Sequence, residues 1–114
     1  MPSMNTLATV VIGAESEAHF MSRIRRLARL CGWIGWHQLD SRGTRGGLPD
    51  LILLRPPRLI FAELKSEYGR LTPQQREAIA MLGRCPGVET YVWRPRDWST
   101  IERTLGKTKV KVKV

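Results

Sequence analysis

Residues 47–66 have the sequence GLPDLILLRPPRLIFAELKS, in which two apolar runs flank the segment RPPR at positions 55–58. Two apolar runs separated by a short turn sequence predict a β-hairpin. If the four residues 55–58 form its loop, Leu54 lies opposite Leu59. This pair fixes the register of the hairpin and therefore predicts which side chains face one another along both strands.

Counting back from the loop places Asp50 directly opposite Glu63, and Lys65 projects from the same face as Glu63 because side chains alternate along a strand. Directly opposed residues have Cβ atoms about 4.5–5.5 Å apart, so two carboxylates there repel each other. A divalent cation would relieve the repulsion, because hard cations bind carboxylate oxygens at roughly 2.0–2.6 Å. The spacing alone leaves two interpretations: a metal-assisted hydrolysis site, or an exposed Asp50 beside an edge-strand ion pair between Glu63 and Lys65.

Composition sets the class of protein and of partner. The 114 residues predict a single domain, and 19 Lys and Arg against 10 Asp and Glu give a formal net charge of +9. This excess favours a polyanionic partner, either nucleic acid or an anionic membrane surface. No apolar run approaches the ~20 residues of a membrane span, and residues 1–13 lack a basic leader segment, so we expect no membrane partner and a cytoplasmic location. The single cysteines Cys31 and Cys85 and only two histidines exclude a disulfide framework and a four-ligand zinc site.

The order of the predicted elements indicates an α/β fold. Apolar spacing from Ser16 to the stop at Gly32 predicts a helix whose outward positions are Arg23, Arg25, Arg26 and Arg29. Further along the chain we expect a strand over 33–39, a glycine-rich loop over 40–48, hairpin strands over 50–54 and 59–65, a helix over 73–83, a strand over 89–93 and a helix over 97–105. The order α-β-β-β-α-β-α predicts a mixed sheet flanked by helices.

Two segments lie outside this predicted domain of residues 15–106. Residues 1–14 show little periodicity and are interpreted as an N-terminal arm. Residues 107–114 alternate lysine with valine after the first pair, as a strand would, but a solvated basic tail is the preferred interpretation.

Glu17 and Gln75 are further candidates for the site, each with a structural alternative. Glu17 shares an i, i+4, i+7, i+11 stripe with Met21, Ile24 and Ala28, which predicts that it lies on the apolar face and needs a partner. The alternative places it in the first helical turn, where the helix dipole favours acids. Gln75 fits a capping box, in which its side chain returns to the N-cap amide.

These residues resemble a known family. Gly47-Leu-Pro-Asp50 followed by Glu63-Leu-Lys65 resembles the Pro-Asp…Asp/Glu-x-Lys signature of restriction-endonuclease-like nucleases. The flanking blocks resemble the VRR-NUC branch (virus-type replication-repair nuclease), in the stand-alone form of phages and bacteria. They are Glu17-x-x-Phe20, Gly32-Trp33, His37, Asp40-Ser-Arg42, Ala62-Glu-Leu-Lys-Ser66, Gly69-Arg-Leu-Thr-Pro73 with Gln75, and Tyr91-Val-Trp-Arg-Pro95. The resemblance covers roughly residues 15 to 105.

The resemblance implies a restriction-endonuclease-like core and a metal-dependent site. One or two Mg²⁺ or Mn²⁺ ions would be held by Asp50, Glu63, the Leu64 backbone carbonyl and Glu17, the last directly or through water. Lys65 would position or activate the attacking water, and Gln75 would support the site from the second helix. No organic cofactor is implied.

The implied function is structure-selective hydrolysis of DNA phosphodiester bonds, on branched DNA such as Holliday junctions. Arg42, Arg45 and Arg70 would contact phosphates, although solvated loop charge is the alternative for the first two. We expect a homodimer, to which the N-terminal arm contributes part of the interface, because a four-way junction needs two paired incisions. Two other functions stay open: a non-catalytic basic nucleic-acid-binding module, and a sequence-specific restriction-type nuclease.

Overall fold

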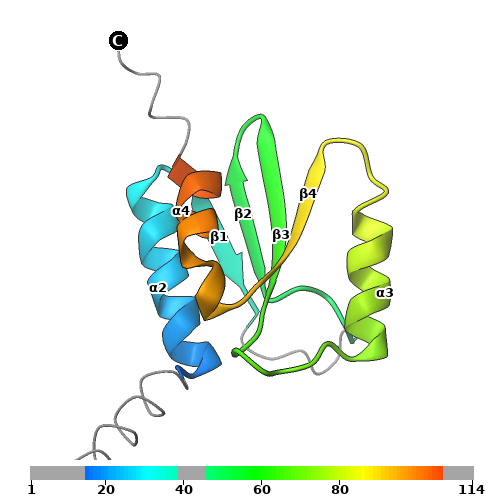
Figure 1. Cartoon of the computed structure of the whole chain (residues 1–114). Helices are drawn as coiled ribbons and strands as arrows, with labels where there is room; N and C mark the ends of the chain where they lie inside the picture. Colours follow the sequence, from blue (N-terminus) through cyan, green and yellow to red (C-terminus); the bar gives the residue numbers. More distant parts are fainter. Residues whose placement is uncertain (1–14, 39–45, 107–114) are drawn as a thin grey trace, which may run out of the picture.

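The computed structural model describes residues 15–38 and 46–106. Its elements follow the predicted order, with one short 3-10 helix added before the last helix (Figure 1). They are α2 (Glu17–Leu30), β1 (Ile34–His37), β2 (Leu51–Arg55), β3 (Arg58–Leu64), α3 (Pro73–Leu82), β4 (Val88–Trp93), η1 (Pro95–Asp97) and α4 (Trp98–Gly106). The predicted α/β class and element order are therefore confirmed.

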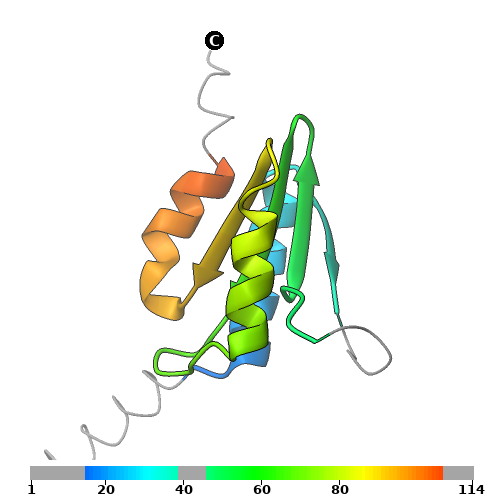
Figure 2. The same ribbon diagram turned by 90° about the vertical axis from the view of Figure 1, so that its right-hand side faces the viewer.

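The four strands form one mixed sheet in the order β1-β2-β3-β4. Strand β2 is antiparallel to both β1 and β3, whereas β4 runs parallel to β3. Helices α2 and α4 lie side by side on one face of the sheet and α3 lies on the other, as the two perpendicular views show (Figures 1 and 2). This arrangement is compatible with the restriction-endonuclease-like core that the sequence predicted.

The core lies between the sheet and the α2/α4 layer. Its fully buried side chains include Phe20 and Ile24 of α2, Leu53 of β2, Ile60 of β3 and Ile101 of α4. Helix α3, by contrast, has no fully buried residue. The sheet face beneath α3 is therefore only partly covered, and this is the face that carries Glu63.

Helix α2 begins and ends where the sequence predicted. Ser16 is the N-cap and its side chain accepts a hydrogen bond from the His19 N–H (3.0 Å). Gly32 adopts a φ of +87° directly after the helix, a conformation that favours glycine. The Trp33 N–H donates to the Ala28 carbonyl at 2.9 Å. Trp33 thereby completes the helix end, and the following strand starts at Ile34 instead of the predicted residue 33.

The hairpin has the predicted register but a shorter loop. Leu54 pairs with Leu59 as expected, while Arg55 pairs with Arg58, which leaves a turn of two residues instead of four. The arginines extend the strands because their charges are satisfied inside the fold. Arg55 donates to the Cys31 and Leu105 carbonyls, and Arg58 donates to the Glu89 carboxylate and the Thr104 carbonyl.

Some sequence-based predictions fall outside the described residues. They include the N-terminal arm (1–14), the Lys/Val tail (107–114) and most of the glycine-rich loop, with Arg42 and Arg45. Within 15–38 and 46–106, no helix is both long and apolar enough to cross a bilayer.

Gly47 gives a test of the loop that leads into Asp50. Its φ is +96°, and an added Cβ would lie 2.4 Å from the Gln74 carbonyl oxygen at the start of α3. Gly87 is a matched control, because its φ is +83° and nothing lies within 4 Å of an added Cβ. We expect Gly47→Ala to lower the free energy of unfolding by about 2 kcal/mol more than Gly87→Ala does, because only Gly47→Ala adds an overpacking cost. Urea unfolding of both variants measures this difference, and equal losses would contradict the close approach.

Candidate active site

Asp50, Glu63 and Lys65 gather at one end of the sheet. Asp50 directly precedes β2, Glu63 is the penultimate residue of β3, and Lys65 directly follows that strand. The last hydrogen-bonded pair of the hairpin is Leu51 with Ala62, so one further step of the same register places Asp50 opposite Glu63. The structure therefore agrees with the expected opposition of the two carboxylates.

The Glu63 carboxylate is the centre of this group. The residue is 1% exposed, and its Oε2 accepts a hydrogen bond from Gln75 Nε2 at 3.0 Å. Lys65 Nζ lies 3.5 Å from the same oxygen. The other oxygen, Oε1, is buried and has no hydrogen-bond partner among the described residues. Such an orphaned buried acceptor is costly unless something else binds it.

The interpretation of Glu63 and Lys65 as an exposed edge-strand ion pair is wrong. Strand β3 lies between β2 and β4, so it is not an edge strand. Lys65 is only 8% exposed, and Glu63 is more deeply buried still. The pair therefore lies inside the fold, where an ionised group needs compensation that water does not supply.

Burial and charge repulsion together raise the pKa of Glu63. Desolvation is the larger cause and the neighbouring Asp50 carboxylate the second, and together they raise the pKa of Glu63 from 4.5 to about 7. The Lys65 ammonium lowers the pKa of Glu63 and offsets part of this effect. Asp50 is half-buried, and its Oδ2 accepts a hydrogen bond from the Leu64 N–H at 3.1 Å. The two acids are thus held close together in a setting that favours a positive charge between them.

Gln75 has both of the roles that the sequence left open. Its Oε1 accepts from the Thr72 N–H at 2.9 Å, and its own N–H donates to the Thr72 hydroxyl at 3.0 Å, which completes the capping box. Its Nε2 is then directed toward Glu63. Because the cap fixes the amide oxygen, it also orients the amide nitrogen that contacts the candidate site.

Glu17 is exposed, so its predicted burial is wrong. It is the first residue of α2, and the buried stripe begins only one turn later, at Phe20. Its carboxylate nevertheless approaches the loop after β3. A Cβ added to Gly69 would lie 3.6 Å from Glu17 Oε2 and 3.5 Å from Lys65 Cδ. The metal role assigned to Glu17 stays a prediction, because no group of three or more His, Cys, Asp or Glu in the described chain is placed to hold an ion.

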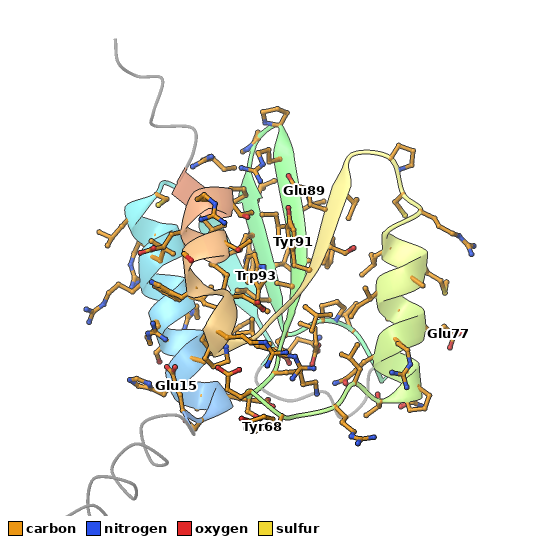
Figure 3. All side chains as sticks on the ribbon, viewed as in Figure 1. Glu15, Tyr68, Glu77, Glu89, Tyr91 and Trp93 are labelled. Carbon is orange, nitrogen blue, oxygen red and sulfur yellow. The ribbon has the colours of Figure 1, made fainter. Side chains whose placement is uncertain are left out.

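Arg94 is a residue whose role the sequence did not predict, and it anchors the loop that follows Lys65. Its Nη1 donates to the carbonyls of Ser66 and Gly69, both at 2.7 Å, and more weakly to that of Glu67 at 3.4 Å. Figure 3 shows Tyr68 of this loop and Glu15, which precedes α2, at the same end of the molecule. The sequence signals were its place in the Tyr91-Val-Trp-Arg-Pro95 block and its position directly after β4, before Pro95, and neither indicated what Arg94 contacts.

Of the three arginines predicted to contact phosphates, only Arg70 lies within the described residues. Arg70 is exposed on the loop between β3 and α3, close in sequence to Tyr68, which is 90% exposed. Arg42 and Arg45 lie outside the described residues. Phosphate binding by these three arginines stays a prediction.

The donor set at this end of the sheet fits a hard divalent cation. Asp50 and Glu63 supply carboxylate oxygens, and the Leu64 backbone carbonyl lies between Glu63 and Lys65 in the chain. Glu63 Oε1, which has no partner among residues 15–38 and 46–106, is the observation that favours a cation here, because carboxylate and carbonyl oxygens suit Mg²⁺ and Mn²⁺.

Comparison with known families gives one match, to the VRR-NUC domain, over residues 5–97. The chain belongs to the VRR-NUC family. A VRR-NUC domain is a nuclease-type domain that acts on DNA, so the resemblance found in the sequence is confirmed at that level. The match begins ten residues before the expected domain start and includes Asp50, Glu63, Lys65 and Arg94. No curated protein and no solved structure matches the chain.

The raised pKa of Glu63 predicts how stability depends on pH when no metal is present. The folded state keeps a proton on Glu63 up to about pH 7, whereas the unfolded chain loses it near 4.5. The contribution of Glu63 to stability is therefore largest below pH 4.5 and is lost as the pH rises to about 7. In EDTA, we expect the stability of Glu63→Gln relative to the native chain to rise by roughly 3 kcal/mol when the pH is raised from 4.5 to 8.

Urea unfolding at both pH values measures this gain. Glu77→Gln is the control, because Glu77 is exposed and points away from the sheet on α3 (Figure 3). A stability difference between Glu63→Gln and the native chain that does not change with pH would contradict the raised pKa.

Proposed function

We propose that this VRR-NUC domain is a metal-dependent DNA endonuclease that hydrolyses phosphodiester bonds and selects branched DNA. The observation that carries the proposal is the buried Glu63 carboxylate, with one orphaned oxygen, opposite Asp50 and beside Lys65. A purely structural role would leave an acid in a position that favours its neutral form. A role in holding a cation explains both the orphaned oxygen and the paired acids.

Asp50, Glu63 and the Leu64 carbonyl would hold one or two Mg²⁺ or Mn²⁺ ions. When bound, such a cation supplies Lewis-acid chemistry that polarises the scissile phosphate and makes water more acidic. The Leu64 N–H orients Asp50, and the capped Gln75 side chain orients Glu63, so both acids are held in place before any substrate arrives.

Lys65 is the candidate for moving or holding a proton at the attacking water. Its ammonium lies 3.5 Å from Glu63 Oε2 and would also offset negative charge that develops on the phosphate. Glu17 would extend the acidic side of the site from the start of α2, through water. Arg94 acts at a distance from the chemistry, since it fixes the loop into which Lys65 leads.

The DNA contacts that we propose are mainly electrostatic. Arg70, together with Arg42 and Arg45, would contact phosphates without reading bases, so selectivity would come from the shape of the substrate. This separates the proposal from a sequence-specific restriction-type nuclease. It is separated from a non-catalytic binding module by the requirement for a divalent cation.

We expect cleavage to require Mg²⁺ or Mn²⁺ and to fall at least about 100-fold in Asp50→Asn, Glu63→Gln and Lys65→Ala, because each removes a group that contacts the metal or the water. Labelled duplex, flap, splayed-arm and four-way-junction DNA, each with Mg²⁺, Mn²⁺ or EDTA, test this. Glu77→Gln should cleave at the native rate. Native cleavage by Asp50→Asn would refute the site assignment, binding without cleavage would favour the non-catalytic module, and cuts at defined sequences in linear duplex would favour the restriction type.

We also propose that the functional unit is a homodimer, because two paired incisions in a junction need two sites related by a two-fold axis. The charge of +9 on each protomer opposes association, so the interface must be largely apolar. The apolar residues of the 7–12 segment would contribute to it. Ile34 and Trp36 of the edge strand β1, 57% and 54% exposed, supply further apolar surface.

Light scattering at micromolar concentration should give a mass near twice 13.0 kDa. Deletion of residues 1–13 should lower that mass, because it removes apolar interface. A monomer at every concentration, also when bound to a junction, would leave a single-strand nicking enzyme as the better description.

A further inference from the structure

A hollow lined by residues of α2 and α4 lies on the helical layer. Figure 1 shows these two helices on the opposite side of the sheet from α3. The hollow is open, has a volume of about 490 Å³ and runs along α2, closed at one side by Trp98 of α4. His19, Arg23, Arg26 and Leu30 follow i, i+4, i+7, i+11 spacing and therefore share one face of the helix. None of the candidate active-site residues lines this hollow.

Three of the side chains that line the hollow are basic, those of His19, Arg23 and Arg26, and none is acidic. Glu15 holds two of these side chains: its Oε1 lies 2.8 Å from Arg23 Nη1, and its Oε2 lies 2.7 Å from His19 Nδ1. The Arg23 guanidinium also lies 4.0 Å from the centre of the Trp98 ring. Arg26 is exposed and has no acidic partner within residues 15–38 and 46–106. Arg26 is therefore the cation of the hollow that no acid of the described residues neutralises, and the one best placed to bind a phosphate.

The floor of the hollow is apolar, and this limits which polyanion fits. Leu27 and Trp98 are half-buried, and Leu30 is 77% exposed. Duplex DNA presents phosphates to a protein surface and keeps its bases stacked inside, so it would leave Leu30 and Trp98 without a partner. A single strand offers phosphates and unstacked bases together, which is the combination that basic grooves with aromatic side chains bind.

We propose that this hollow binds single-stranded nucleic acid, as the unpaired arm of a branched substrate. Arg26 would contact the backbone, while a base would pack on Leu30 and on the Arg23–Trp98 pair. The arm-binding role rests on the proposed function, because it assumes that branched DNA is the substrate. An acidic, partly apolar peptide is the other ligand with matching chemistry, and the experiment separates the two.

The test measures binding in the full chain carrying Asp50→Asn, in EDTA, with labelled oligothymidylate and a duplex of equal length. We expect Arg26→Ala to lower affinity for the single strand about fivefold or more and to reduce the slope of log K against log salt by about 0.7, the value for one single-strand phosphate. Arg84→Ala is the matched control, because Arg84 is exposed beyond α3 on the other layer. Duplex affinity should fall no more in Arg26→Ala than in Arg84→Ala.

Leu30→Ser separates base contacts from phosphate contacts. We expect it to lower single-strand affinity about fivefold with an unchanged salt slope, and to have no effect on an abasic strand of the same length. Leu30 is exposed, so the fold should persist, which circular dichroism checks.

Three results would overturn the proposal: equal effects of Arg26→Ala and Arg84→Ala, native single-strand affinity in Leu30→Ser, or competition by polyglutamate as effective as by oligothymidylate. The last result would identify an acidic-peptide site. Cleavage of blunt duplex by Arg26→Ala, in the native Asp50 background, is measured separately. If the native protein cuts no DNA, the proposed nuclease function fails while the binding result still decides the single-strand site.

Discussion

The burial of one carboxylate opposite another constrains this end of the molecule. The register of the hairpin places Glu63 opposite Asp50. Strand β3 lies between two other strands, and the Glu63 side chain is buried. Burial and the neighbouring Asp50 carboxylate together raise the pKa of Glu63. Each nearby contact compensates part of this cost: an amide from Gln75, an ammonium from Lys65 and a backbone N–H on Asp50.

These compensating groups come from different elements, so the site requires the whole sheet and one helix to be in place. The capping box at the start of α3 orients the Gln75 amide. Arg94, which directly follows β4, anchors the loop beyond Lys65. The Lys65 N–H itself donates to the Trp93 carbonyl at 3.0 Å, which continues the β3–β4 pairing by one residue. The helix that approaches the site most closely, α3, is also the one with the least buried surface.

The sequence predicted the site best where a regular period applied. Alternation along a strand and one pair, Leu54 with Leu59, were enough to predict that Asp50 faces Glu63. The helical period gave the wrong burial for Glu17. A stripe of residues at helical spacing predicts the direction of a side chain around the helix axis, but not how far the core extends toward the first turn.

Arg94 could not be predicted for a different reason. Its acceptors are main-chain carbonyls of a loop more than twenty residues earlier, and carbonyls carry no sequence signal. The loop length was misjudged because Arg55 and Arg58 resemble solvated turn residues in sequence. In the structure they are held by carbonyls, by a carboxylate and by the Trp33 ring.

The turn at Pro56 and Pro57 lies at the end of the hairpin opposite to the acids. Both prolines are exposed, and the five residues of β2 separate them from Asp50 by about 17 Å. A fluorophore or a short tether attached there would stay clear of the carboxylates, although the flanking Arg55 and Arg58 contact the carboxyl-terminal ends of α2 and α4. The hairpin tip therefore offers an attachment point for surface immobilisation, with the carboxylates directed away from the support.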